Sequence, residues 1–246
     1  MISVITATFN AERELPALIA SLLGQSSLEF EWVIVDGAST DGTVELLRSV
    51  TKVATRWVSE PDFGIYHALN KGLALANGDY YLVLGSDDTL LPGAIEAYAR
   101  AASASGADVV AAPVLVDGIT VHPRRTRPWI RSGPPMVAAH SVGSLIRKSL
   151  HDDIGPYSRR FPIAADTYFL LQVAQRQKQF AYLSEAVGSF GTAGLSSGDT
   201  LGALTESWRA NVAVRGHYWL QLPMFLARLV ANGARIARGQ GRQSSP

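Results

Sequence analysis

Short apolar runs alternate with amphipathic segments along the first 110 residues. Runs rich in β-branched and aromatic residues predict strands at residues 2–9, 32–35, 56–59, 80–84 and 109–112. Between them, leucine, isoleucine and alanine recur every three or four positions, which predicts helices at residues 10–25, 43–50, 65–76 and 92–104. Alternation of this kind predicts an α/β fold in which helices flank a mostly parallel sheet on both faces.

Polar side chains follow four of these expected strands. The carboxyl ends of parallel strands meet at one edge of a sheet, and open α/β sheets bind their ligands there. Each of these polar residues alone is explained as a turn or helix-cap residue, but polar residues at the ends of four consecutive strands are better explained by a binding site. The residues concerned are Thr8 and Asn10, Asp36, Glu60 and Asp62, and Asp87 and Asp88.

Asp87 and Asp88 follow the apolar run of residues 80–84 directly. Two carboxylates about 4 Å apart repel by ~4 kcal/mol at an effective dielectric of about 20. A hard divalent cation, which prefers oxygen ligands, removes that repulsion. The alternative is a polar turn in which Asp88 caps the helix after Pro92. No glycine-rich dinucleotide motif or lysine-bearing phosphate loop accompanies the pair, so the sequence does not support those cofactor sites.

The second half of the chain is less regular. Asp117-Gly118 predicts a hairpin turn. The basic, proline-rich residues 122–135 predict a long loop that is either a lid over a site or a solvated linker. Asp166 stands at an expected helix start, as an N-cap or as a base held in place by that helix start. A further strand is expected at residues 180–187, and a glycine-rich turn at residues 191–197.

The C-terminal segment combines apolar, aromatic and basic residues. Two helices divided near residues 220–223 are expected there, followed by a disordered tail at residues 239–246. After Glu206 the sequence has six arginines and no acidic residue. This composition fits an amphipathic helix at an anionic membrane surface. The alternative is a helix packed on the sheet with a solvated basic face.

Composition sets broad limits on these interpretations. The 246 residues, 47% of them hydrophobic, suffice for one large domain with an appendage. We expect a domain at residues 1–200, with halves at 1–112 and 113–200, then a helical segment at 201–238. The absence of cysteine excludes disulfides and thiolate metal sites. With no basic leader and no apolar run of about 20 residues, we expect a cytoplasmic protein, peripheral at most on the inner face of the plasma membrane.

The order of motifs resembles that of family 2 glycosyltransferases with the GT-A fold, from residue 2 to about residue 195. The resemblance includes His140 and the approach to Asp166, and its combination of motifs is highly specific. The motifs are Thr6-Ala7-Thr8-Phe9-Asn10, Val35-Asp36-Gly37-Ala38-Ser39-Thr40-Asp41-Gly42-Thr43, Ser59-Glu60-Pro61-Asp62, Gly64-Ile65-Tyr66, Asn70-Lys71-Gly72, Gly78-Asp79 and Ser86-Asp87-Asp88.

The resemblance implies inverting transfer of a sugar from a nucleotide-sugar donor to a hydroxyl of a glycan or lipid-linked acceptor, in bacterial envelope or exopolysaccharide synthesis. It implies that Asp88 holds Mn²⁺ or Mg²⁺ on the diphosphate and that Asp166 is the catalytic base. The implied nucleotide-binding residues are Thr8, Asn10, Asp36, Asp62 and Asp87, and the implied diphosphate or acceptor contacts are His140, Lys71 and Tyr66.

The sequence departs from the family pattern at a few positions. His67 stands where relatives usually have Asp, and the base follows Ala164-Ala165 rather than a Glu. Two rival interpretations stay open: a catalytically inactive nucleotide-sugar-binding module, and a nucleotide-sugar pyrophosphorylase-like enzyme. A nucleic-acid binder is not expected, because the acidic strand ends would repel phosphate.

Overall fold

The computed structural model describes residues 1–123, 137, 141–191, 199–233 and 236. Most of the expected basic loop, His140, nearly all of the expected turn at residues 191–197 and the C-terminal tail therefore lie outside the described residues.

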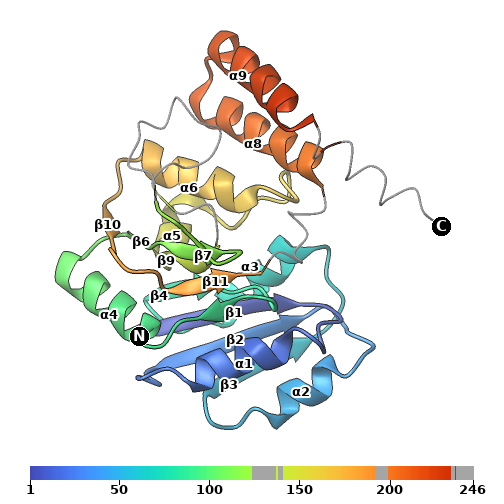
Figure 1. Cartoon of the computed structure of the whole chain (residues 1–246), viewed down its shortest axis with the longest axis vertical. Coiled ribbons are helices and arrows are strands. Elements are labelled where there is room, and N and C mark those ends of the chain that lie inside the picture. Colours follow the sequence, from blue (N-terminus) through green and yellow to red (C-terminus); the bar gives the residue numbers. More distant parts are fainter. Residues whose placement is uncertain (124–136, 138–140, 192–198, 234–235, 237–246) are drawn as a thin grey trace.

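Among the described residues, seven strands form the main sheet, in the order β10-β6-β9-β4-β1-β2-β3 (Figure 1). All neighbours run parallel except β9, which is antiparallel to both β4 and β6. The predicted mostly parallel sheet is confirmed. The strands are β1 (Ile2–Thr8), β2 (Phe30–Asp36), β3 (Ala54–Ser59), β4 (Tyr80–Val83), β6 (Val109–Ala111), β9 (Ser144–Arg147) and β10 (Phe180–Tyr182).

A second, smaller sheet was not predicted. It has the order β5-β11-β7-β8 and consists of β5 (Thr89–Leu90), β11 (Gly188–Phe190), β7 (Val114–Val116) and β8 (Ile119–Val121). The turn at Asp117-Gly118 is confirmed, since both residues have positive φ and join antiparallel β7 and β8. The single strand expected at residues 180–187 is wrong, because β10 stops at Tyr182 and the chain then crosses to β11 in the other sheet.

Helices cover both faces of the main sheet. One face is covered by α1 (Leu15–Leu23), α2 (Thr43–Ser49) and α4 (Ala94–Ser105), and the other by α3 (Ile65–Leu75), α5 (Leu150–Ile154) and α6 (Ala165–Gln175). Helix α1 is shorter than expected, because Asn10 has a positive φ and a turn at residues 11–14 precedes the helix. Strand β2 is buried along its whole length, as a central strand between two helix layers should be.

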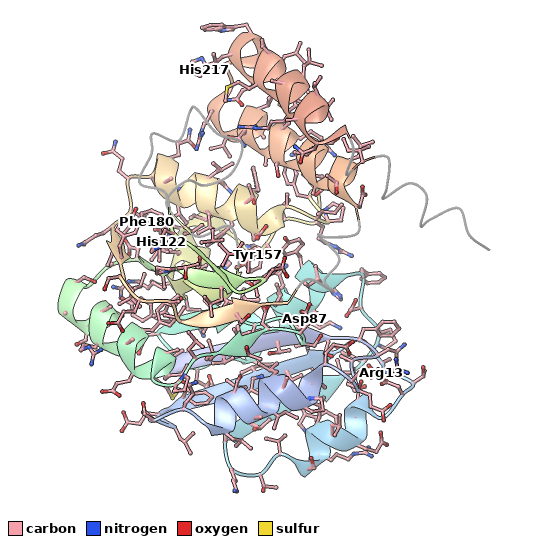
Figure 2. All side chains as sticks on the ribbon, in the orientation of Figure 1. Arg13, Asp87, His122, Tyr157, Phe180 and His217 are labelled. Carbon is pink, nitrogen blue, oxygen red and sulfur yellow. The ribbon has the colours of Figure 1, made fainter. Side chains whose placement is uncertain are left out.

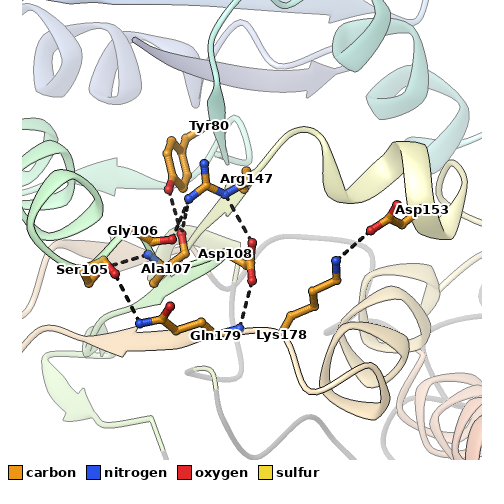
Figure 3. A network of polar contacts seen from close by, with 9 residues as sticks. All are labelled: Tyr80, Ser105, Gly106, Ala107, Asp108, Arg147, Asp153, Lys178 and Gln179. Atoms are coloured by element: carbon orange, nitrogen blue, oxygen red, sulfur yellow. Dashed lines mark hydrogen bonds and ion pairs between the residues drawn. The ribbon is translucent and has the colours of Figure 1, made fainter.

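A polar network joins the sheet at the edge where β4, β6 and β10 begin (Figure 3). The guanidinium of Arg147, at the end of antiparallel β9, lies 4.7 Å from the ring centroid of Tyr80 and 3.3 Å from the carboxylate of Asp108. Asp108 also accepts a hydrogen bond from the backbone N–H of Gln179 at 2.9 Å. These polar groups therefore hold the ends of neighbouring strands together at this edge of the sheet.

Two C-terminal helices, α8 (Thr200–Arg215) and α9 (Tyr218–Ala231), lie beyond α6 (Figure 1). Helix α8 packs on α6, and α9 packs on α8. The division expected at residues 220–223 is wrong: the break falls at Gly216-His217, where both residues have positive φ, and Pro223 lies inside α9. Within the described part of the chain, no helix is long and apolar enough to span a membrane.

Gly72 allows α3 to lie directly on β1. A Cβ at this position would stand 2.5 Å from Cγ2 of the buried Ile5. Glycine to alanine within a helix normally stabilises by about 1 kcal/mol, but here we expect Gly72→Ala to lower the free energy of unfolding by about 1–3 kcal/mol through overpacking. Urea denaturation measures this. In an Ile5→Ala background the same substitution should cost less, because the clashing methyl is gone; an equal cost in both backgrounds would contradict the assignment.

Candidate functional site

The carboxyl ends of β1, β2 and β4 meet at one edge, as the sequence predicts. Register pairs Thr8 with Asp36, and β4 runs parallel to β1 on its other side. Figure 2 shows Asp87 and Arg13 toward the same side of the molecule, the side at which β1 and β2 end. The structure therefore brings the first-half candidate residues to a common edge.

Asp36 is fully buried and organises the loop after β2. Its carboxylate accepts hydrogen bonds from the backbone N–H of Ser39 at 3.0 Å, from the Ser39 hydroxyl, and from the Ser59 hydroxyl at 2.6 Å. The neighbouring loop is attached to it, because Asn10 donates its backbone N–H to Ser39 Oγ and accepts from Thr40 N–H at 2.9 Å. Two loops thus form one rigid rim, although neither serine was predicted to belong to the site.

An aromatic ring and an acid flank Gly37 on this rim. A Cβ at Gly37 would stand 3.0 Å from Asp62 Oδ2 and 3.3 Å from Phe9 Cδ2, so the three residues are neighbours. Phe9 is 63% exposed, whereas adjacent Thr8 is 5% exposed and its hydroxyl has no hydrogen-bond partner among the described residues. An exposed ring next to a buried, unpaired hydroxyl is a surface on which a planar ligand can stack. Sequence reasoning missed Phe9, although an aromatic directly after a buried strand was a usable signal.

Asp88 is 1% exposed and is held by two glycines. Its carboxylate accepts backbone N–H bonds from Gly85 at 2.7 Å and from Gly191 at 2.9 Å. Gly191 follows β11 and packs on Asp87, where a Cβ would stand 2.3 Å from Asp87 Cγ. The second sheet therefore completes the acidic turn. The alternative in which Asp88 caps the following helix is wrong, because Gly93 is the N-cap of α4.

Burial, together with the Asp87 carboxylate, raises the pKa of Asp88 to about 6, even though the bonds from Gly191, Gly85 and Ser141 lower it. A nearby cation would favour the ionised form. The described residues contain no group of three or more metal-ligating side chains. Mg²⁺-type ions are commonly held by one or two carboxylates together with substrate phosphates and water, so the Asp87–Asp88 pair fits such an ion.

Asp166 lies in the first turn of α6 and is bonded to α3. Its Oδ1 accepts hydrogen bonds from the Tyr66 hydroxyl at 2.8 Å and from the Thr167 N–H at 2.6 Å. The Tyr66 hydroxyl also lies 2.9 Å from the carbonyl oxygen of Ile163. Burial raises the pKa of Asp166, while the bonds from Tyr66 and Thr167 lower it. The N-cap interpretation of Asp166 is wrong, because Ala164 occupies that position.

The Tyr66 hydroxyl can serve both protonation states of Asp166. It has one proton, which it donates to the carboxylate when Asp166 is ionised. When Asp166 is protonated, the acid can donate to the phenol oxygen, and the Tyr66 proton can turn to the Ile163 carbonyl. Such an arrangement suits a carboxylate that takes up and releases a proton.

Helix α8 holds the segment that leads to Asp166. Glu206 is buried, and its Oε2 accepts the backbone N–H of Ile163 at 2.8 Å and of Ala164 at 3.0 Å. From the sequence, Glu206 only marked the end of the acidic residues. Because its partners are backbone groups, no side-chain motif could have revealed this contact.

Lys71 and His140, the two remaining candidates, are not shown to be part of this arrangement. The Lys71 ammonium lies 2.7 Å from Glu60 Oε1 and 3.1 Å from the Pro61 carbonyl, so its charge is directed into the loop before α3. His140 lies outside the described residues. The arrangement thus combines a rim that carries an exposed aromatic ring, the buried Asp88 beside the partly exposed Asp87, and a separate carboxylate bonded to a tyrosine. It suits a phosphate-bearing ligand at the first two features and proton removal at the third.

In a comparison with protein families, residues 3–165 match the family Glycosyl transferase family 2. A PGL/p-HBAD biosynthesis glycosyltransferase of Mycobacterium bovis is 31% identical over 176 residues, which cover 69% of this chain and 68% of the relative.

Solved structures with a similar fold agree. TarS 1–349 of S. aureus in complex with UDP-GlcNAc superposes with a TM-score of 0.68 at 19% identity, covering 98% of this chain and 80% of that one. The chain covers 43% of the longer TarS structure. Mannosyltransferase PcManGT from Pyrobaculum calidifontis, in complex with GDP-Man and Mn²⁺, gives 0.68 at 17% identity, covering 95% and 75%. The expected GT-A-type fold is confirmed.

The Tyr66–Asp166 contact can be tested directly. Tyr66→Phe removes a donor that stabilises the ionised carboxylate, so the pKa of Asp166 should rise further above its ordinary value. Carboxyl ¹³C shifts followed by NMR through a pH titration measure the change. Tyr168→Phe, two residues from Asp166 on the same helix, is the matched control and should leave that titration in place. An unmoved Asp166 titration in Tyr66→Phe would contradict the contact.

Proposed function

Since the chain belongs to glycosyl transferase family 2 and is therefore a glycosyltransferase, we propose that it moves a sugar from a nucleotide-sugar donor to a hydroxyl of a glycan or lipid-linked acceptor, with inversion at the anomeric carbon. The acceptor would belong to bacterial envelope or exopolysaccharide synthesis. Two relatives support a nucleotide-sugar donor, because their structures hold UDP-GlcNAc and GDP-Man.

The donor nucleotide would bind at the rim after β1 and β2. Phe9 offers a ring on which a base can stack, and Asp62 lies beside it. Asp36 already accepts three hydrogen bonds from Ser39 and Ser59, so its main contribution would be to shape the rim, with about one of its four lone pairs left for a ligand. Thr8 and Asn10 would complete the pocket. Asp87 would contact the ribose or the metal.

Asp88, with Asp87, would hold Mn²⁺ or Mg²⁺ at the donor diphosphate. When bound, such an ion stabilises the negative charge that develops on the leaving nucleoside diphosphate. PcManGT was solved with Mn²⁺. What this chain contributes is a preformed, desolvated carboxylate whose geometry is set by the backbone of Gly85 and Gly191.

Asp166 would be the catalytic base. It would accept the proton of the acceptor hydroxyl as that oxygen bonds to the anomeric carbon and the bond from that carbon to the diphosphate oxygen breaks. The proton would then leave to solvent. Tyr66 would act as a positioning residue that holds the carboxylate in one orientation. This differs from the diphosphate or acceptor contact that we expected for it from the sequence.

The observation that carries the proposal is the joint presence of two separately held carboxylate sites. A catalytically inactive module would not need an Asp166 that is held by Tyr66 and by a backbone segment bonded to Glu206. A pyrophosphorylase-like enzyme would need a basic phosphate loop after β1. The loop at residues 10–13 contains Glu12 hydrogen-bonded to Gly42 instead. A lipid-linked acceptor would be met at the cytoplasmic face of the plasma membrane, where the enzyme would be peripheral.

Asp166→Asn tests the base. Asparagine keeps an oxygen that can accept from Tyr66 and Thr167, so the fold and donor binding should persist while transfer falls by at least about 100-fold. Product formation is measured by mass spectrometry with bacterial lipid-linked acceptors and a panel of UDP-, GDP- and dTDP-sugars. Donor-induced thermal shifts serve as the control for folding and binding. Near wild-type transfer in Asp166→Asn would exclude this residue as the base.

The raised pKa of Asp88 gives the donor site a pH dependence. A pKa of about 6 in the folded state lies above the ordinary value, so ionisation of Asp88 costs stability as pH rises through 6, and bound Mn²⁺ offsets that cost. The Mn²⁺-dependent thermal shift with donor should be full near pH 8, and the apparent Mn²⁺ affinity should fall by about tenfold per unit below pH 6.

Asp88→Asn is the control for this titration. It should remove both the Mn²⁺-dependent shift and its pH dependence, while the metal-independent shift from nucleotide alone remains. A Mn²⁺ effect that is equally strong at pH 5 and pH 8 in the wild type would speak against Asp88 as the ligand.

A further inference from the structure

Helix α9 presents an apolar face to solvent. Its large exposed hydrophobic residues recur every three or four positions, so they form one stripe along the helix. Trp219 is 76% exposed and Val230 84%, and Pro223, Ala227 and Ala231 lie exposed beside the stripe. The large members of the stripe are Tyr218, Trp219, Leu222, Leu226 and Val230.

The polar residues of α9 face inward instead. Gln221 is 2% exposed, and burial lowers the pKa of the Arg228 guanidinium. Phe225 stacks on Trp208 of α8 with ring centroids 5.1 Å apart, which fixes the side of α9 that is attached. A helix that buries a glutamine and exposes a tryptophan contradicts the usual polarity of a surface helix, so its outer face requires a partner.

We propose that this outer face of α9 inserts into the surface of an anionic lipid bilayer. The 14 residues of α9 extend about 21 Å at 1.5 Å each, which is too short to cross a hydrocarbon core of about 30 Å. The helix therefore lies in the plane of the membrane. Tyr218 and Trp219 at its start are the residue types that accumulate at lipid headgroups.

Charge complementarity selects the anionic lipid. Arg209 is exposed on α8 and Arg215 is partly exposed at its end, and the sequence from residue 207 onward contains no acidic side chain. Basic residues close to the bilayer surface are attracted to anionic headgroups. A second copy of the chain fits less well, because two-fold pairing of this face would bring together two segments that carry arginines and no acidic residue.

Docking in this way would also orient the active site. Helix α9 packs on α8, and Glu206 of α8 holds the backbone that leads to Asp166. This inference rests on the proposed function, because binding to a membrane would bring the enzyme to a lipid-linked acceptor. The contact itself is tested separately from transfer.

The test uses the full chain with phosphatidylcholine vesicles that contain or lack phosphatidylglycerol. We expect the wild type to float with the anionic vesicles, and the triple variant Trp219→Ser, Leu222→Ser, Leu226→Ser to lose at least about tenfold in partition coefficient. Ile119→Ser is the matched control, because Ile119 is 70% exposed on β8, far from α9 in sequence, and should not change binding.

The absence of cysteine allows an independent readout. An environment-sensitive dye attached to Leu226→Cys should shift its emission to the blue on anionic vesicles, whereas the same dye on Ile119→Cys should not. This variant changes one exposed side chain, so it tests the face even if the triple variant fails to fold.

Three outcomes would overturn the proposal: equal partitioning of the wild type to neutral vesicles, unchanged binding of the folded triple variant, or a wild-type dimer in sedimentation that the triple variant abolishes without any vesicle binding. Donor-induced thermal shifts are measured in every variant. If a variant loses lipid binding but keeps its donor-induced shift, the effect is on the α9 face alone. If the wild type shows no donor-induced shift at all, the proposed function is contradicted and the membrane contact is not.

Discussion

Burying carboxylates at one edge of a sheet is the constraint on which this site depends. A carboxylate removed from water is stable only where N–H or O–H groups replace the lost hydration. Asp36 obtains them from two serines, Asp88 from two glycine N–H groups, and Asp166 from Tyr66 and a backbone N–H. Each aspartate has its own set of donors, and these donors include distant residues such as Ser59, Gly191 and Tyr66, so the same bonds also fix the segments that surround the three carboxylates.

The three aspartates differ in how far their carboxylates remain available to a ligand. Asp36 accepts three hydrogen bonds from Ser39 and Ser59, and these bonds hold the rim together. Asp88 keeps a raised pKa because its two backbone bonds do not offset its burial and the neighbouring carboxylate, which makes it a strong binder of positive charge once it is ionised. Asp166 is bonded to a tyrosine whose hydroxyl can reverse its role. The three aspartates thus differ in their hydrogen-bond partners, which suits them to the three different roles proposed for them.

The C-terminal helices are connected to this site rather than appended to the fold. Glu206 links α8 to the backbone before Asp166, and α8 carries α9, whose outer face is apolar. Packed elements therefore connect the exposed hydrophobic stripe of α9 to Asp166, the residue proposed as the base. An enzyme that meets its acceptor at a lipid surface benefits from such rigidity, because orientation of the reacting groups accounts for much of catalysis.

The sequence by itself determined the main sheet, the common edge at which Thr8, Asp36 and Asp88 emerge, and the family, because apolar periodicity and strand-end residues are local patterns that adjacent residues encode. The second sheet was not predicted, because its strands of two or three residues are too short to show an alternating pattern. Only the tertiary structure decided which groups satisfy each aspartate and which side of α9 is exposed. Gly191, Tyr66 and Glu206 lie 40 to more than 100 residues from their partners in sequence, and a helical wheel reports an apolar face without reporting whether that face turns inward or outward. Both questions are settled by packing between distant segments, which no local pattern contains.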